Sequence, residues 1–158
     1  MRQSWHSTPH GIRVLRTVSK IPYRKGLNHL LRELDTYRGI YLSSGYEFPG
    51  RYSRWDIASV MPPLEIVGAG RQMTLRPLNA RGEVISAILA PLLESHPHWE
   101  SFERRGASLV GRLKPLPRLF PEEERSKQPS AFSILRTLID EFRPVADPHF
   151  ALVGAFGV

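Results

Sequence analysis

The sequence lacks cysteine altogether, which excludes a disulfide framework and any thiolate metal site. It also lacks an apolar run close to the about 20 residues that a membrane-spanning helix needs. The N-terminus, M-R-Q-S-W-H-S-T-P-H, has no apolar block of the kind that a secretory signal carries. These absences are typical of a protein of the reducing cytoplasm, and we expect no association with a membrane.

The chain also lacks charge balance, because 22 lysines and arginines face 15 aspartates and glutamates in 158 residues, a net charge of +7. A basic balance is compatible with a nucleic-acid-binding module. Here, however, the basic residues are scattered from Arg2 to Arg143 with acidic residues between them, and tight basic doublets are rare. An arginine-rich solvated surface is therefore the favoured interpretation, and nucleic-acid binding is a weaker alternative.

Apolar spacing predicts the elements of the N-terminal third. Residues 12–18 are rich in β-branched side chains and predict a strand that follows a loose N-terminal arm. Leucines between Leu27 and Leu34 recur at helical spacing, so we expect an amphipathic helix there. The apolar run at 40–44 predicts the next strand.

Strands and turns are expected to alternate through the middle of the chain. Residues 51–60 predict a strand that ends at a Pro-Pro pair. Residues 64–78 predict a hairpin whose turn contains Gly68 and Gly70. The N-A-R-G stretch at 79–82 predicts a further turn.

The second half of the chain predicts two helices. Residues 84–93 have helical spacing, although Pro91 lies within that run and should kink the helix or lie near its start. Between 96 and 121 we expect loop, with one short strand at 109–113. A second helix should begin at Pro129 or Ser130. Its predicted buried stripe is Phe132, Leu135, Leu138, Ile139 and Phe142.

The last nine residues, F-A-L-V-G-A-F-G-V at 150–158, predict a strand that is buried on both faces. Chain termini usually lie exposed and polar, so we expect this chain to be the front part of a longer protein. The predicted fold class is α+β, a mainly antiparallel sheet with helices packed on its outer face. Residues 1–16 are expected to form a partly disordered arm and the first strand.

One stretch, Y-L-S-S-G-Y-E-F-P-G-R-Y-S-R-W at 41–55, has the composition of a ligand pocket. Ser43 and Ser44, at a strand end, can exchange hydrogen bonds with a ligand, and Arg51 can hold a carboxylate through two bonds. Flat apolar walls could come from Tyr46, Tyr52 and Trp55. These groups suit a small zwitterionic aromatic molecule. The alternative is that 45–50 is a connecting loop and the aromatic residues belong to the core.

Catalytic motifs are lacking. We find no GxGxxG or Walker motif, and no nucleophile with a recognisable general base. His96 and His98 could ligate a metal, but no third ligand lies at useful spacing, so solvated loop histidines are the favoured interpretation. We expect this chain to hold no cofactor of its own.

Several long motifs resemble one enzyme family. The pattern at 41–56, ending R-Y-S-R-W-D and followed by P-P-L, a glycine hairpin and L-N-A-R-G, resembles the N-terminal region of component I of anthranilate synthase. The most similar form is the bacterial one, which is fused to its glutamine amidotransferase. F-P-E-E-E-R-S-K-Q-P-S-A-F-S-I-L-R at 120–136 and D-P-H-F-A-L-V-G-A-F-G at 147–157 also look like that family. The resemblance implies that 17–158 is its N-terminal domain, truncated before the catalytic domain.

What the family does follows from the resemblance alone. It converts chorismate and glutamine to anthranilate, pyruvate and glutamate, the first step of the tryptophan branch. Its catalytic, chorismate-binding and Mg²⁺-binding residues lie in a C-terminal domain that this sequence does not contain, so the chain by itself is expected to be inactive. The implied partners are that catalytic domain and a glutamine amidotransferase domain. For the region present, the resemblance implies feedback regulation by tryptophan.

In this family an L-L-E-S motif at a strand end binds tryptophan, and it matches 41–44 here. Its serine fits Ser44. Its glutamate is replaced by Ser43, and Glu47 is the candidate to supply the missing carboxylate. The R-Y-S that follows matches 51–53, with Arg54 as the other candidate base. The implied tryptophan-binding set is Ser43, Ser44, Glu47, Arg51, Tyr52 and Ser53.

A literal L-L-E-S also occurs at 92–95, where it ends a helix-period run and precedes H-P-H. We interpret this second motif as a helix end rather than a binding site. The resulting hypothesis is a regulatory and structural part of anthranilate synthase. The alternative is a stand-alone sensor domain for aromatic amino acids.

Overall fold

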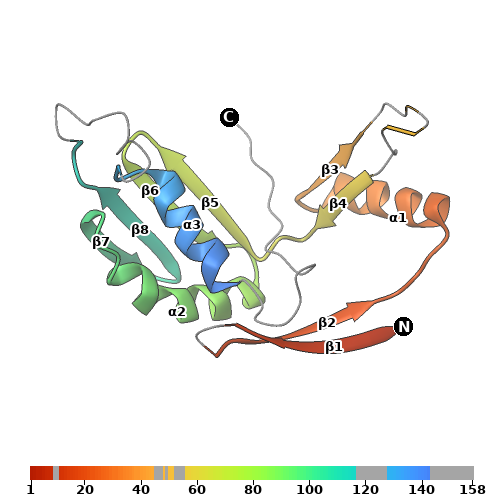
Figure 1. The fold of residues 1–158 in the computed structure, drawn as a ribbon, viewed down its shortest axis with the longest axis horizontal. Helices are drawn as coiled ribbons and strands as arrows, with labels where there is room; N and C mark the ends of the chain where they lie inside the picture. Colours follow the sequence, from red (N-terminus) through yellow and green to blue (C-terminus); the bar gives the residue numbers. More distant parts are fainter. Residues whose placement is uncertain (9–10, 45–47, 49, 52–55, 117–127, 143–158) are drawn as a thin grey trace. The chain divides into compact units, whose positions relative to one another are not determined.

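A computed structural model describes residues 1–8, 11–44, 48, 50–51, 56–116 and 128–142 (Figure 1). The described residues fall into two compact units, one comprising Met1–Arg2 and Thr17–Pro62, the other Gln3–Arg16 and 63–142. The predicted strand at 150–158 lies outside the described residues. The predicted boundary between an arm at 1–16 and a domain at 17–158 stays a prediction.

The first unit is a helix packed on a two-stranded ribbon. Helix α1 spans Tyr23–Thr36 and contacts both strands, β3 at Gly39–Ser43 and β4 at Asp56–Val60. The strands are antiparallel. The helix and the first of these strands confirm the sequence predictions. Of the strand expected at 51–60, only Asp56–Val60 is observed; Arg51 lies in a turn, and 52–55 lie outside the described residues.

The second unit contains a four-stranded antiparallel sheet. Its strands are β5 (Leu64–Ala69), β6 (Gln72–Pro77), β7 (Trp99–Arg105) and β8 (Ser108–Leu113), in the order β5-β6-β8-β7. The predicted hairpin is therefore confirmed as β5 and β6. Only one of its two glycines is in the turn: Gly70 has a φ of +58°, whereas Gly68 pairs with Met73 inside the ladder.

Helix α2 spans Ala80–Glu94 and begins earlier than the sequence suggested. The Asn79 side chain caps it by accepting a hydrogen bond from the backbone N–H of Gly82 at 3.1 Å. The stretch at 79–82 is therefore a helix start, and the prediction of a separate turn there was wrong. Pro91 lies inside the helix, three residues before its end, so the expected position near the helix start was wrong.

Strand β7 was predicted as loop. Its sequence, W-E-S-F-E-R-R, buries only Trp99 fully and half-buries Phe102. The remaining side chains are charged or polar and exposed, because β7 lies at the edge of the sheet. An edge strand with one apolar face and a charged outer face gives little apolar signal in the sequence.

Helix α3 spans Ala131–Glu141, and Ser130 caps it through a bond from the Ser133 N–H, as predicted. The predicted buried stripe was partly wrong, because Phe132 is 71% exposed and Ile139 is 39% exposed. The face that contacts the core is rotated toward Ile134, which is 2% exposed. Leu135, Leu138 and Phe142 do contact the core.

The core of this unit lies between the sheet and its two helices (Figure 1). Met73 and Leu75 from β6 and Leu109 and Leu113 from β8 project from one sheet face, where they meet residues of α2 and α3. Burying each of these side chains contributes about 1.5–3 kcal/mol. The α+β class, with antiparallel strands and helices on an outer face, is thus confirmed.

The N-terminal residues form a two-stranded sheet of β1 (Arg2–Ser7) and β2 (Arg13–Val18). The second strand confirms the prediction at 12–18, whereas the first falls where a loose arm was expected. Thr8, which is buried, links this sheet to α3 because its hydroxyl donates to the Glu141 carboxylate at 3.3 Å.

Candidate functional site

Three of the six residues predicted to bind tryptophan lie among the described residues: Ser43, Ser44 and Arg51. Glu47, Tyr52 and Ser53 lie outside them, as do the proposed aromatic walls Tyr46 and Trp55. The candidate site is therefore built from the end of the β3–β4 ribbon and from the turn that contains Arg51.

The strand register places a carboxylate next to the predicted hydroxyl. Ser43, the last residue of β3, pairs with Asp56, the first residue of β4. Directly paired residues of antiparallel strands point to the same face, with Cβ atoms about 4.5–5.5 Å apart. Ser43 is exposed and Asp56 is half-buried, so a carboxylate and a hydroxyl lie side by side at the open end of the ribbon.

Helix α1 holds this carboxylate. The hydroxyl of Tyr23, the first residue of α1, donates a hydrogen bond to Oδ2 of Asp56. This contact joins two segments 33 residues apart in the sequence. It also identifies the ribbon face that carries Ser43 and Asp56 as the face toward α1. Neither Tyr23 nor Asp56 was among the predicted site residues, because Tyr23 lies outside the stretch at 41–55 and Asp56 only ends the pattern that carries the family resemblance.

Arg51 is anchored at the turn between the strands. Its backbone N–H donates to the Phe48 carbonyl at 3.0 Å, and its guanidinium carbon lies 5.8 Å from the centroid of the Phe48 ring. This distance is within the range of a cation–π interaction. Both side chains are exposed, so the guanidinium and the ring can reach a ligand. Phe48 was not among the predicted aromatic residues, although it lies in the same motif.

The described groups differ in chemistry in a way that suits a zwitterion. Ser43 and Ser44 offer hydroxyls, Asp56 offers an acceptor for an ammonium group, and Arg51 offers donors for a carboxylate. Phe48 offers an apolar surface. Each of these side chains has the chemistry to hold one part of an amino acid; among these described side chains, none forms a nucleophile–base pair.

The histidines near the end of α2 do not form a metal site with other described residues. Among those residues, no group of three His, Asp or Glu side chains lies close enough to hold a metal ion. The rings of His96 and His98 are 4.9 Å apart in an edge-to-face arrangement, and the His98 N–H donates to Nδ1 of His96 at 3.2 Å. Burial and the neighbouring His98 lower the pKa of His96 below its ordinary value of 6.5.

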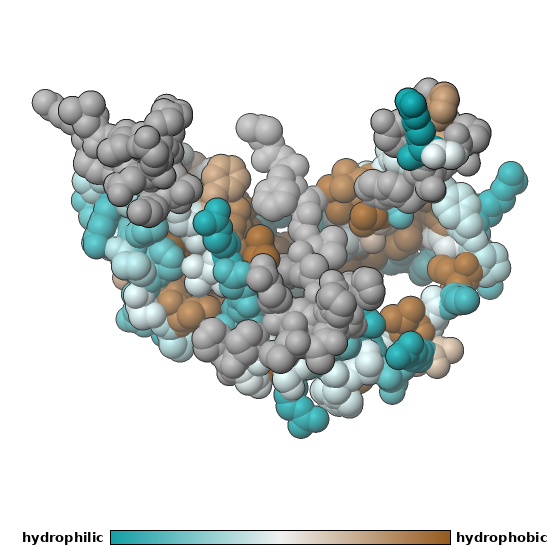
Figure 2. Space-filling view, viewed as in Figure 1, coloured by the Kyte–Doolittle hydropathy of each residue, from teal (hydrophilic) through white to brown (hydrophobic). Residues whose placement is uncertain are grey.

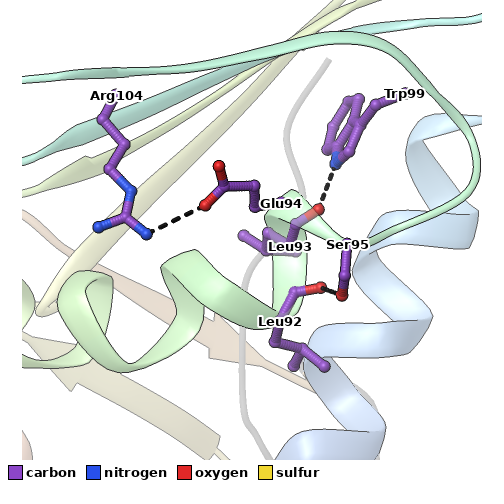
Figure 3. A network of polar contacts seen from close by, with 6 residues as sticks. All are labelled: Leu92, Leu93, Glu94, Ser95, Trp99 and Arg104. Atoms are coloured by element: carbon purple, nitrogen blue, oxygen red, sulfur yellow. Dashed lines mark hydrogen bonds and ion pairs between the residues drawn. The ribbon is translucent and has the colours of Figure 1, made fainter.

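The literal L-L-E-S motif forms the end of a helix, as predicted. Figure 3 shows that its groups are engaged in local contacts. The Leu93 carbonyl accepts from the Trp99 indole N–H at 2.7 Å, and the Ser95 hydroxyl donates to the Leu92 carbonyl at 3.0 Å. Glu94 pairs with Arg104 at 3.2 Å. These contacts end α2 and hold it against β7.

On the face shown in Figure 2, the hydrophilic residues of the described parts are spread out rather than gathered in one patch. None of the described helices is long and apolar enough to cross a membrane.

Comparison with known proteins identifies the relationship. The chain is 36% identical over 149 residues to an anthranilate synthase from Azospirillum brasilense, a match that covers 94% of this chain and 20% of that protein. The chain therefore spans about a fifth of the length of this curated relative. No protein-family model and no solved structure match it. Across nearly its whole length, the chain is a homologue of part of anthranilate synthase, as its motifs predicted.

Proposed function

We propose that this chain is the N-terminal regulatory and structural part of an anthranilate synthase. The observation that carries this proposal is the 36% identity over 94% of the chain. In such an enzyme, chorismate and glutamine become anthranilate, pyruvate and glutamate. Because the chain spans only a fifth of its relative, the catalytic residues, the Mg²⁺ site and the amidotransferase activity would come from the other four fifths.

We further propose that the end of the β3–β4 ribbon forms part of a tryptophan feedback site. Two observations support this: Ser43, Ser44 and Arg51 lie on one ribbon and its turn, and an aromatic ring accompanies the guanidinium. Glu47, Tyr52 and Ser53 complete the proposed set. In this proposal Ser44 bonds the polar head of tryptophan, and Arg51 balances its carboxylate.

A chimeric enzyme tests the proposal. Residues 1–158 would replace the matching segment of the Azospirillum brasilense synthase, and anthranilate would be followed by its fluorescence with chorismate, glutamine and Mg²⁺. We expect turnover and inhibition by tryptophan. A folded chimera without turnover would contradict the structural role. Turnover without any inhibition would contradict the feedback site.

Substitutions of two serines, Ser44 in the first motif and Ser95 in the second, test where the site lies. Removing one hydrogen bond to a charged group costs about 1.5–3 kcal/mol, or roughly 10- to 150-fold in affinity. In the chimera, Ser44→Ala should raise the tryptophan concentration for half inhibition at least several-fold, relative to the uninhibited rate of the same variant. Ser95→Ala, at the end of α2, should change neither turnover nor inhibition. The reverse result would mean that the site lies at the second motif.

Binding by the separate 158-residue chain distinguishes the alternatives. A stand-alone sensor for aromatic amino acids would bind tryptophan tightly without the rest of a synthase, which calorimetry would detect. A nucleic-acid-binding module would show polyanion binding that weakens steeply with salt. For a synthase segment we expect weak tryptophan binding and no salt-dependent binding of DNA or RNA.

A further inference from the structure

We infer that Asp56 supplies the carboxylate that binds the ammonium group of the regulatory ligand, and so restricts the site to amino acids. This inference rests on the proposed feedback site and assigns a residue that the predicted tryptophan-binding set does not contain. The juxtaposition that carries it is Ser43 opposite Asp56 at the end of the ribbon.

The first step is the charge that the motif has lost. A serine stands at position 43, where the resembling motif has a glutamate. A hydroxyl can accept a hydrogen bond from an ammonium group, but it cannot balance the charge of that group. A zwitterionic ligand above Ser43 therefore needs an anionic side chain from another position.

The second step is the register. Each β4 residue lies opposite a fixed β3 residue, from Gly39 and Val60 to Ser43 and Asp56. Asp56 thus shares its face with Ser43, and their Cβ atoms are about 4.5–5.5 Å apart. A group that bonds the Ser43 hydroxyl is within the reach of an aspartate side chain at position 56. Strand β3 thus has a serine where the motif has a glutamate, and the neighbouring strand β4 supplies a carboxylate at Asp56.

The third step is how Asp56 is held. The Tyr23 hydroxyl donates to its Oδ2 atom, and the residue is half-buried. A carboxylate offers about four acceptor positions, so a bond from a tyrosine is compatible with a further bond from an ammonium group. A carboxylate whose rotamer is already fixed loses less entropy when a ligand binds. Tyr23 would therefore act as a positioning residue.

The inference predicts which ligands the site distinguishes. With a carboxylate at Asp56 and a guanidinium at Arg51, both charged groups of an amino acid have a partner. Indole-3-propionate keeps the ring and the carboxylate of tryptophan but lacks the ammonium group. It should therefore inhibit less well than tryptophan, and the difference between the two compounds should depend on Asp56.

The experiment uses the full-length chimera, with each variant compared with its own uninhibited rate. Asp56→Asn keeps the shape of the side chain and removes its charge. We expect the tryptophan concentration for half inhibition to rise at least about tenfold, while that for indole-3-propionate stays within about twofold. Asp56→Glu should restore most of the preference for tryptophan, and Tyr23→Phe should produce a smaller loss than Asp56→Asn.

Asp35 is the matched control, because it is an exposed aspartate of α1 outside the ribbon end. Asp35→Asn should leave the preference for tryptophan over indole-3-propionate unchanged, whereas Glu47→Gln tests the other candidate carboxylate. If Glu47→Gln abolishes that preference and Asp56→Asn does not, the inference is overturned while the feedback site stands. If the two compounds lose potency equally in Asp56→Asn, the residue has a structural role only and the inference fails. If tryptophan does not inhibit the unaltered chimera, the proposed feedback site fails with it.

Discussion

Replacing Trp99 with phenylalanine tests how the core of the second unit is closed. Trp99 is 9% exposed, and its indole N–H donates to the Leu93 carbonyl at 2.7 Å. Its ring lies against Gly111, where a Cβ atom would come within 2.5 Å of it, and its centroid is 5.8 Å from that of Phe102. The residue thus joins the end of α2 to strands β7 and β8.

The expected loss of stability has two parts. The Leu93 carbonyl also accepts the His96 N–H at 3.0 Å, so it keeps one partner, and the lost hydrogen bond costs about 0.5–1.5 kcal/mol. Trp-to-Ala substitutions in cores cost about 3–5 kcal/mol, and the smaller phenylalanine ring should forfeit about 1–2 kcal/mol of that. Trp99→Phe should therefore lower the free energy of unfolding by about 1.5–3.5 kcal/mol.

Urea unfolding of the 158-residue chain, followed by far-ultraviolet circular dichroism, measures this change. The matched control is Trp5→Phe, because Trp5 is 61% exposed. The guanidinium carbon of Arg13 lies 4.9 Å from the centroid of the Trp5 ring. A surface cation–π contact is worth about 0.5–1 kcal/mol, so the control should lose no more than that. Equal losses for the two variants would show that Trp99 does not close the core in the way described.

Further outcomes can be measured on the same chain. Gly111→Ala should cost about 1–3 kcal/mol because its Cβ would meet the Trp99 ring at 2.5 Å, whereas Gly68→Ala, with 3.6 Å to the nearest atom, should cost less in the same urea titration. Because burial and His98 lower the pKa of His96 in the folded chain, the unfolded chain binds that proton more readily, and stability should fall as the pH drops below about 6.5. His96→Gln should make the urea midpoint depend less on pH between about pH 7.5 and 5.5. An unchanged pH dependence would contradict the role given to His96. Without the rest of a synthase, the purified chain should form no anthranilate from chorismate, ammonia and Mg²⁺; fluorescence above the enzyme-free rate would refute that expectation.

Apolar spacing was sufficient for the elements whose apolar residues recur with a regular period. The leucines of α1 and the hairpin of β5 and β6 were predicted correctly because their spacing matches a helix and a strand pair. Strand β7 was not predicted, since it lies at a sheet edge and exposes its charged side chains. In α3 both Ile139 and Ile134 fit a helical stripe, and only the position of the sheet decides that Ile134 is the buried one.

The candidate site could also be predicted only in part from the sequence. Ser43, Ser44 and Arg51 could be selected from the sequence because they lie within one short motif. The pairing of Ser43 with Asp56 depends on the register between two strands, and the contact with Tyr23 depends on how α1 packs on them. Neither relation has a sequence pattern, because register is set by the faces that the strands bury.

The two borders of the four-stranded sheet differ in chemistry, and this difference limits how the sheet can associate. The β7 border carries ion pairs, such as Arg112 with Glu100 at 3.0 Å, and charged edges resist strand addition. The β5 border, L-E-I-V-G-A, has one charged residue, and Val67 is 47% exposed. In the vocabulary of polymer chemistry, the described part of this sheet has one reactive border. Two copies that paired through β5 would use both such borders, so growth through the described sheet would stop at the dimer instead of continuing into a fibre.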